Sequence, residues 1–310
     1  MSAMSIMKGM SGGSEKEVSD MNTVLLFPSS FFDRRKVDED LAQEYEAARA
    51  AGWNEIILFG YEDWFENSRL RLTEEPEQEV QAIYRGWMMK PDQYKAFYES
   101  LLLSRIRLLT TPDMYTLMHA FPNVYPKIQE DTAGIMTYPL HTQIDVREML
   151  RVFPRFMVKD YVKSVKGTEF PVYFDDSVSK VAFDSWMEVF YKYRGDLLTG
   201  GICIKEYLDL KRYDNKTNEF RVFYVNHQVL SICRNSLQGN CTPVPPKDLV
   251  QKYRGLDSVF YTIDFAELAD GTWKIIEAGD GGVSGLSEGQ DQEAFYRALA
   301  VAAEILPAGD

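Results

Sequence analysis

Residues 259–280 have the sequence VFYTIDFAELADGTWKIIEAGD, in which an Asp-Gly pair separates two apolar runs. Such a pair between apolar runs is among the strongest short-range signals of a β-hairpin with a two-residue turn. That turn would place Asp264 directly opposite Glu277, and opposite residues share one face of the sheet. On the other face, Glu267 would pair with Lys274. The sequence therefore predicts a hairpin that holds two carboxylates side by side.

The two carboxylates, Asp264 and Glu277, would repel each other if nothing lay between them. Carboxylate oxygens with room for phosphate oxygens suit Mg²⁺, so the pair is a candidate metal site. Two other interpretations stay open: both groups point to solvent, or a three-residue loop shifts the register. The apolar neighbours Ile263, Phe265 and Ile275 are typical of a covered sheet and favour the metal site.

The hairpin continues into a glycine-rich segment, EAGDGGVSGLSEG, at residues 277–289. So many glycines indicate a backbone that turns sharply or approaches a ligand closely. Asp280 lies three residues beyond Glu277 and is a further candidate ligand for a metal or a substrate. An ordinary flexible loop before the last helix is the alternative.

Three lysines lie in apolar strands that we predict over residues 156–164 and 201–208. Lys159 and Lys163 are four residues apart, so within one strand they would point to the same face. Lys205 lies in the second strand. A lone lysine in a strand usually lies at a solvated sheet edge, where its charge prevents pairing with other strands. Three lysines in apolar strands of an acidic chain instead favour the binding of anionic phosphates.

A second hairpin is predicted around residues 226–227, which suit a two-residue turn. It would place Glu219 opposite Arg234 and Arg221 opposite Ile232, so that both arginines share a face with the glutamate. Two guanidinium groups on one face match the geometry of phosphate or carboxylate oxygens. A surface ion pair that contributes little is the alternative.

The first part of the chain has a different pattern, in which apolar strands alternate with helices. Apolar strands predicted at residues 23–28 and 55–60 flank a helical pattern, which indicates a βαβ unit with a parallel sheet. We therefore divide the chain into a flexible tail (1–21), an α/β domain (22–125) and an α+β domain (126–310). No glycine-rich phosphate turn of a dinucleotide fold follows the first strand.

Composition excludes several classes of function. The 310 residues include 34 Lys and Arg against 47 Asp and Glu, a net charge of −13 that would repel nucleic acids. Cys203, Cys233 and Cys241 form no C-x-x-C pair, so we expect reduced thiols, no zinc site and a cytoplasmic location. No apolar run reaches the length of a membrane span, and the tail lacks the apolar core of a signal peptide.

The order of these elements resembles the ATP-grasp superfamily. The resemblance rests on IKEYL at 204–208, EFRVF at 219–223, IDF at 263–265 and IIEAGDG at 275–281. It is closest to the bacterial and phage clade named for one arginine and two lysines, with a distant likeness to a eukaryotic cell-division-cycle assembly factor, and it covers roughly residues 126–306. It implies an α/β N-terminal domain followed by an α+β ATP-grasp domain, whose two subdomains hold the nucleotide between them.

The resemblance also implies ATP and Mg²⁺ as cofactors and a role for each candidate residue. It assigns Lys159 or Lys163 together with Lys205 to the ATP phosphates, Glu206, Tyr207 and Leu208 to adenine, Arg221 and Arg234 to the γ-phosphate or an acyl phosphate, and Asp264 and Glu277 to Mg²⁺. Many members of the superfamily place Asn two residues after the metal-binding glutamate. Here Gly279 stands at that position, so Asp280 is the substitute candidate and the number of metal ions stays open.

The resemblance implies a carboxylate–amine ligase that forms an acyl phosphate and releases ADP and phosphate. The chain has no nucleophile–histidine signature, as expected for a reaction that needs positioning and cations instead. The substrates would be a small-molecule or peptide acid and an amine, with no nucleic acid and no membrane. Two alternatives stay open: an ATP-binding assembly factor for a protein partner, and a phosphotransferase acting on a small molecule.

Overall fold

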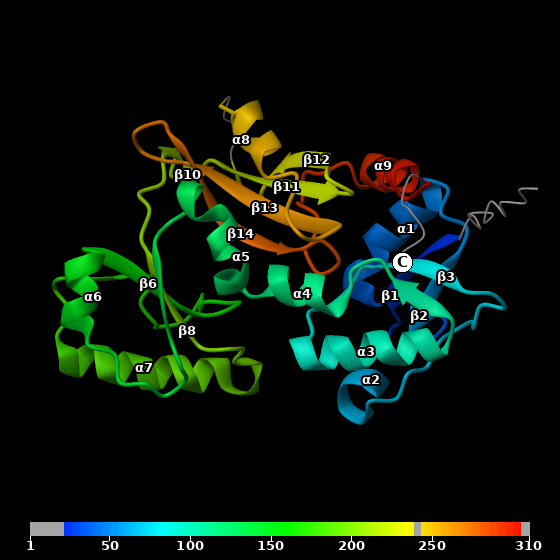
Figure 1. The fold of residues 1–310 in the computed structure, drawn as a ribbon, viewed down its shortest axis with the longest axis horizontal. Helices are drawn as coiled ribbons and strands as arrows, with labels where there is room; N and C mark the ends of the chain where they lie inside the picture. Colours follow the sequence, from blue (N-terminus) through cyan, green and yellow to red (C-terminus); the bar gives the residue numbers. More distant parts are fainter. Residues whose placement is uncertain (1–21, 239–242, 305–310) are drawn as a thin grey trace, which may run out of the picture.

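The computed structural model describes residues 22–238 and 243–304. The predicted flexible tail, residues 1–21, and Cys241 lie outside the described residues. Figure 1 shows an elongated molecule with the first part of the chain at one end and the sheet that contains β6 and β8 at the other. A sheet that contains β11, β13 and β14 lies between them. No helix among the described residues is long and apolar enough to cross a membrane.

The first sheet has the order β2-β1-β3-β4, and each neighbouring pair is parallel. Its strands are β1 (Thr23–Pro28), β2 (Ile56–Phe59), β3 (Val80–Tyr84) and β4 (Ile106–Leu108). This confirms the parallel sheet that the sequence predicts. The helices around it are α1 (Ala42–Ala50), α2 (Tyr61–Asn67), α3 (Pro91–Leu103) and α4 (Pro112–His119).

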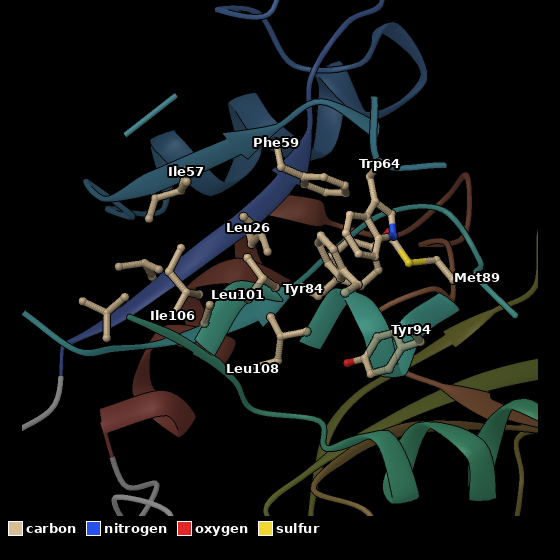
Figure 2. Packing of buried hydrophobic residues seen from close by; sticks show 14 of the residues in the cluster. Leu26, Ile57, Phe59, Trp64, Tyr84, Met89, Tyr94, Leu101, Ile106 and Leu108 are labelled. Atoms are coloured by element: carbon tan, nitrogen blue, oxygen red, sulfur yellow. The ribbon is translucent and has the colours of Figure 1, made fainter. Parts of the chain in front are cut away.

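Both faces of the parallel sheet are covered, as its continuous apolar strands require. On one face Leu26, Phe59 and Tyr84 pack against Trp64 of α2 and Leu101 of α3 (Figure 2). The other face packs against α1, against α9 (Gln292–Glu304) and against strand β11. The last helix therefore completes the core of the first domain, and this core crosses the predicted boundary at residues 125–126.

The second sheet is antiparallel and has the order β12-β11-β13-β14. Its strands are β11 (Glu219–Val225), β12 (Gln228–Arg234), β13 (Phe260–Glu267) and β14 (Trp273–Asp280). One face packs against α5 (Phe121–Ile128) and α8 (Lys247–Lys252). The opposite face carries the charged residues of the candidate site.

The third sheet, β5-β8-β6-β7, is also antiparallel. Its strands are β5 (Ile135–Tyr138), β6 (Arg155–Asp160), β7 (Phe174–Asp175) and β8 (Ile202–Glu206). Two helices, α6 (Val146–Val152) and α7 (Lys180–Arg194), pack on it through an apolar stripe that includes Phe183 and Phe190. A short hairpin of β9 (Arg212–Tyr213) and β10 (Lys216–Thr217) follows.

Candidate active site

The β13–β14 hairpin brings Asp264 opposite Glu277, which confirms the predicted carboxylate pair. The turn itself differs from the prediction, because Glu267 lies opposite Trp273 and not opposite Lys274. A β-bulge between Asp264 and Phe265 then restores the predicted register. The pair is therefore held by a bulge in the middle of the hairpin as well as by the turn at its end.

Ile276 is the extra residue of that bulge, and its carbonyl binds a lysine. Lys205 Nζ of β8 donates a hydrogen bond to Ile276 O at 2.6 Å. Bulges leave backbone groups unpaired and re-aim them, which explains why this carbonyl is available to another sheet. The contact joins the second and third sheets at the candidate site.

Two lysines from the third sheet lie beside the carboxylates of the second sheet. Lys159 and Lys205 come from the neighbouring strands β6 and β8, and each is only 6–7% exposed. Lys159 Nζ lies 3.0 Å from Glu277 Oε1. Both ammonium groups also lie over the ring of Phe121, at 5.4 Å for Lys159 and 3.8 Å for Lys205.

The ammonium group of Lys205 is buried close to that of Lys159, and both facts act on its pKa. Burial, together with the charge of Lys159, lowers the pKa of Lys205 to about 8, although Glu277 acts in the opposite direction. Burial would raise the pKa of Glu277, but Lys159 and Lys205 outweigh it and hold that pKa below its ordinary value. Two buried cations share one carboxylate, so the site has positive charge to offer an anion.

Lys163 does not lie on the same strand as Lys159, and that part of the prediction was wrong. Strand β6 ends at Asp160, whose Oδ1 accepts hydrogen bonds from the backbone N–H groups of Val162 and Lys163 at 2.7 and 2.6 Å. The chain therefore turns before Lys163. Its ammonium group still lies close enough to Glu277, Lys159 and Arg221 for their charges to act on its pKa.

Arg221 of β11 lies beside Asp264, as the strand pairing dictates. Its Nε and Nη2 donate to the two carboxylate oxygens of Asp264, each at 2.8 Å, the fork geometry typical of arginine. Nη1 donates to the carbonyl of Gly285 at 2.9 Å, in the glycine-rich loop. Asn235 Nδ2 lies 3.3 Å from Asp264 Oδ2.

Arg234 is placed on the opposite face of the sheet from Arg221. A bulge between Phe223 and Tyr224 shifts the β11–β12 register, so Arg234 lies opposite Phe220 and not Glu219. Arg221 accordingly faces Cys233 and not Ile232, and both predicted pairings were wrong. Arg234 lies over the Phe220 ring at 4.6 Å and donates to Asn218 Oδ1 at 2.9 Å. Its contacts are with Phe220 and Asn218, away from Arg221 and Asp264.

Asp280 does not join the other two carboxylates. It lies opposite Tyr261, an odd number of residues from Asp264, and therefore points to the other face of the sheet. Oδ1 accepts from the N–H of Gly282 at 2.9 Å, and Oδ2 has no hydrogen-bond partner among the described residues. Across residues 22–238 and 243–304, no group of three or more His, Cys, Asp or Glu is arranged to hold a metal.

Burial raises the pKa of Asp280 to about 7, which predicts a pH-dependent cost to stability. In the unfolded chain the carboxyl releases its proton near its ordinary pKa of 3.8, so stability falls as pH rises from about 4 to 7. Above pH 7 the cost is about 4 kcal/mol. We expect Asp280→Asn to melt several degrees above the wild type at pH 8, with a smaller difference at pH 5 and little difference at pH 4. Asp176→Asn, at an exposed carboxylate, should show no such pH-dependent difference; equal shifts in both variants would contradict the assignment.

A cavity of about 600 Å³ opens beside these groups, between the second and third sheets. Its walls include Lys159, Lys205, Glu206, Tyr207, Leu208 and Glu277. A stack at its rim was not predicted: the Arg155 guanidinium lies 4.1 Å from the Tyr173 ring centroid and 4.7 Å from that of Tyr207. Arg212 and Lys216, which line the same cavity, were not predicted either.

Asp264 and Glu277 fit a magnesium ion that is shared with phosphate oxygens. Mg²⁺ is commonly held by one or two carboxylates plus phosphates and water, so a third protein carboxylate is not required. Their current partners are cations: Arg221 for Asp264 and Lys159 for Glu277. The arrangement therefore supplies the oxygen donors, with cations beside them that suit phosphate.

Two antiparallel sheets that enclose a cavity lined with lysines and carboxylates agree with the arrangement that the ATP-grasp resemblance implies. Residues 149–299 match the model of an ATP-grasp domain, family 3 of the clade named for one arginine and two lysines. The chain therefore carries an ATP-grasp domain of this clade, which confirms the resemblance. No curated protein matches the chain in sequence.

Solved ATP-grasp structures share this fold over most of the chain. The ATP-grasp ligase PsnB, complexed with a minimal precursor, Mg and ADP, is 11% identical with a TM-score of 0.57, covering 92% of this chain and 99% of that one. The D-cycloserine synthetase DcsG is 15% identical (TM-score 0.57; 90% and 99% covered). The D-alanine–D-alanine ligase of Bacillus anthracis, complexed with ATP, is 13% identical (TM-score 0.57; 92% and 96%). At these identities the likeness shows the fold.

Proposed function

We propose that the protein is an ATP- and Mg²⁺-dependent ligase that joins a carboxylate to an amine and releases ADP and phosphate. The observation that carries the proposal is a cavity between two sheets that is lined by Lys159, Lys205 and Glu277. The Arg221–Asp264 ion pair lies beside it, because Asp264 is directly opposite Glu277 in the hairpin. The solved neighbours support it, since PsnB is described as a ligase with Mg and ADP and DcsG as a synthetase.

Each group has a role in this proposal. Lys159 and Lys205 bind the phosphates, while Glu206, Tyr207 and Leu208 form the wall for adenine. Asp264 and Glu277 hold Mg²⁺, which would neutralise charge on the phosphate oxygens when bound. Lys163 stands at the edge of the site, and Arg221 faces the γ-phosphate. Arg234 and Asp280 have no role in the proposal, because the sheet turns them away.

The reaction requires two displacements. First, an oxygen of the substrate carboxylate attacks the γ-phosphorus, forming a C–O–P linkage as the bond from that phosphorus to ADP breaks. Next, the amine nitrogen attacks the acyl carbon, forming the C–N bond as phosphate leaves with the C–O electron pair, and the amine proton passes to water. Lysines and Arg221 hold the oxygens where negative charge grows, so no protein nucleophile is needed.

We further propose a two-domain organisation and a cytoplasmic location. Residues 22–125 would serve as the domain that precedes ATP-grasp, and residues 126–310 as the ATP-grasp domain. The cytoplasm supplies ATP, Mg²⁺ and reducing conditions, which suits the cysteines. The substrates would be a small-molecule or peptide acid and an amine.

Glu277→Gln tests the nucleotide site, because it removes the negative charge and keeps the shape. We expect ATP with Mg²⁺ to raise the melting temperature of the wild type by several degrees at about 100 times the dissociation constant. In the variant the Mg²⁺-dependent part of that shift should disappear. Glu188→Gln, at an exposed position on α7, should behave as the wild type. No shift with ATP and Mg²⁺ in the wild type would refute the proposal.

A further inference from the structure

A second cavity, of about 640 Å³, lies between the first domain and the glycine-rich loop. The first domain contributes the segment that follows β3, residues 85–90, and the loop contributes residues 282–285. Two residues connect this cavity to the candidate site. Gly285 lines it and accepts a hydrogen bond from Arg221, and Lys163 lines it while lying within range of Glu277 and Lys159. Lys163 therefore stands between the two cavities.

The wall of this second cavity is apolar, and much of it faces solvent. The apolar side chains include Tyr61, Phe65, Trp87, Met88, Val162 and Leu197. Phe65 is 44% exposed, Trp87 37%, Met88 36% and Leu197 64%. Tyr61 and Phe65 stack at a centroid distance of 5.6 Å. Exposed apolar side chains gathered around a concavity of this size are typical of a ligand site.

Most charged groups along the wall are already paired or lie away from the candidate site. Arg85 is bound to Glu44 at 2.6 Å, and Arg194 to Asp160 at 2.8 Å. His119 is buried, which together with Lys163 lowers its pKa to about 4, so it is neutral at pH 7.

Three more charged residues line the cavity, namely Glu62, Lys90 and Asp196. They come from α2, from the start of α3 and from the turn after α7, whereas Lys163 lies beside the lysines and carboxylates of the first cavity. Among the described residues the Lys163 ammonium group forms no ion pair. It is therefore the cation that an anionic ligand would meet at the end of the cavity next to the phosphates.

We propose that this second cavity binds the acid substrate, and that the acid carries a bulky apolar group. This inference rests on the proposed ligase function. The carboxylate lies at Lys163, next to the position of the γ-phosphate, and the apolar group packs among Phe65, Trp87 and Met88. Small or doubly charged acids leave the apolar wall unfilled and bind poorly, because the hydrophobic contribution scales with the apolar area buried.

Calorimetric titration of the full chain with 3-phenylpropanoate and with propanoate tests the proposal, in the presence of Mg²⁺ and a non-hydrolysable ATP analogue. We expect 3-phenylpropanoate to bind at least about tenfold more tightly, the effect of burying one ring. An N-acetylated peptide that ends in Phe tests whether the acid substrate is the C-terminus of a peptide or a small free acid. Equal affinity for the two simple acids, or no binding of any of the three ligands, would overturn the proposal.

Met88→Asp places a negative charge on the apolar wall and should weaken binding of 3-phenylpropanoate about tenfold or more. Leu103→Asp makes the same change at a side chain that is 89% exposed on α3 and lines neither cavity, and it should leave the affinity unchanged. Equal losses in both variants would overturn the proposal. Binding of the ATP analogue is measured separately in every variant. Acid binding that fails while the analogue still binds overturns this inference alone, and failure of the analogue overturns the ligase proposal.

Discussion

Replacing Lys205 with methionine is expected to weaken ATP–Mg²⁺ binding about 100-fold while raising the stability of the ligand-free chain. A charge-assisted hydrogen bond to phosphate is worth enough to account for such a loss, and Lys205 is one of the two buried cations at the cavity. The same burial destabilises the ligand-free chain, because the charged ammonium group loses its water before any nucleotide is bound.

The stability effect follows from the pKa of Lys205, which burial lowers from 10.5 to about 8. Between these two values the unfolded chain binds a proton that the folded chain has released, so wild-type stability rises with pH across this window. At pH 7 the charged group costs about 3 kcal/mol. Losing the hydrogen bond to Ile276 O removes about 1 kcal/mol of that gain, which leaves Lys205→Met more stable by about 2 kcal/mol.

Thermal unfolding at pH 7 and pH 10 measures this effect directly. The advantage of Lys205→Met should be a few degrees at pH 7 and should disappear near pH 10, where the wild-type lysine is neutral in the fold. Lys192→Met, at an exposed position on α7, controls for the loss of a surface charge. Unchanged ATP–Mg²⁺ affinity in Lys205→Met would mean that the phosphates bind elsewhere.

The carboxylate pair could be predicted because its cause is local. An Asp-Gly pair between apolar runs fixes a hairpin, and residues opposite each other follow from counting. The count was wrong at the turn, where Glu267 meets Trp273, and a bulge at Asp264 brought Glu277 back into register. Asp264 and Glu277 therefore lie opposite each other because of both the hairpin and the bulge. Only the hairpin is indicated by the sequence.

The position of Arg234 could not be predicted, because no glycine or proline marks the bulge between Phe223 and Tyr224. One inserted residue moves every later side chain to the other face. The position of Lys163 had a signal that went unused. An aspartate often caps a turn through its side chain. Here Asp160 accepts hydrogen bonds from two backbone N–H groups, and the strand ends at this residue.

Arg85 is the largest omission, since its partners are distant in sequence. In QAIYRGWMM it looks like an arginine at the end of a strand, yet it is only 2% exposed. Its guanidinium donates to Glu44, 41 residues earlier, and to the carbonyls of Gly281 and Ser284, almost 200 residues later. No local pattern indicates such a network, because the packing of α1, β3 and the glycine-rich loop creates it.

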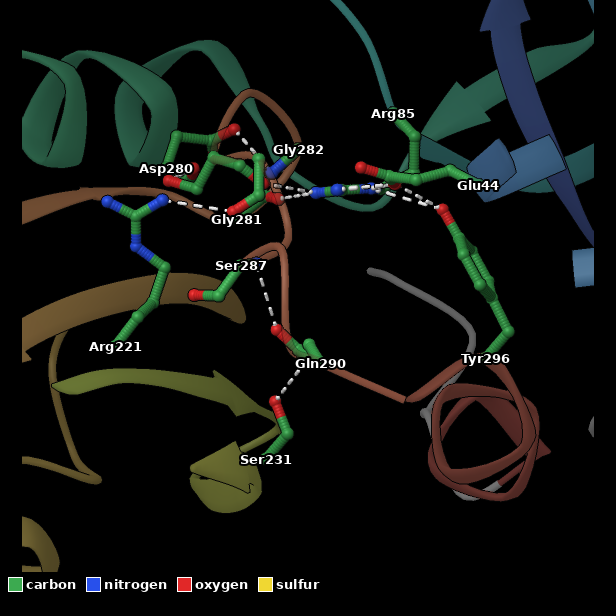
Figure 3. A network of polar contacts seen from close by, with 12 residues as sticks. Glu44, Arg85, Arg221, Ser231, Asp280, Gly281, Gly282, Ser287, Gln290 and Tyr296 are labelled. Carbon is green, nitrogen blue, oxygen red and sulfur yellow. Dashed lines mark hydrogen bonds and ion pairs between the residues drawn. The ribbon is translucent and has the colours of Figure 1, made fainter. Parts of the chain in front are cut away.

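Arg85 and Arg221 approach the glycine-rich loop from opposite sides (Figure 3). Arg85 donates to the carbonyls of Gly281 and Ser284, the second at 2.9 Å, and Arg221 donates to Gly285 at 2.9 Å. The hydroxyl of Tyr296 donates to Glu44 Oε2 at 2.7 Å and so ties α9 to the same group. The first domain thus fixes the loop that lines the second cavity.

Arg85→Met should destabilise the fold by about 3–5 kcal/mol, because it leaves Glu44 buried without a cation. Adding Glu44→Leu should recover part of this loss, since the double variant buries no unpaired charge. Chemical denaturation of the wild type, both single variants and the double variant measures the coupling. If the double variant recovers nothing, the carbonyls of the loop, rather than Glu44, account for the role of Arg85.

The same variant separates the role of the loop from that of the fold. Under conditions where Arg85→Met is fully folded, we expect ATP–Mg²⁺ to bind nearly as in the wild type, because the lysines and carboxylates of the first cavity do not contact Arg85. Acid-dependent ADP release should fall at least about tenfold, since the loop that borders the acid and holds Arg221 has lost its anchor on the first domain. Normal turnover in a folded Arg85→Met would show that Arg221 alone positions this loop.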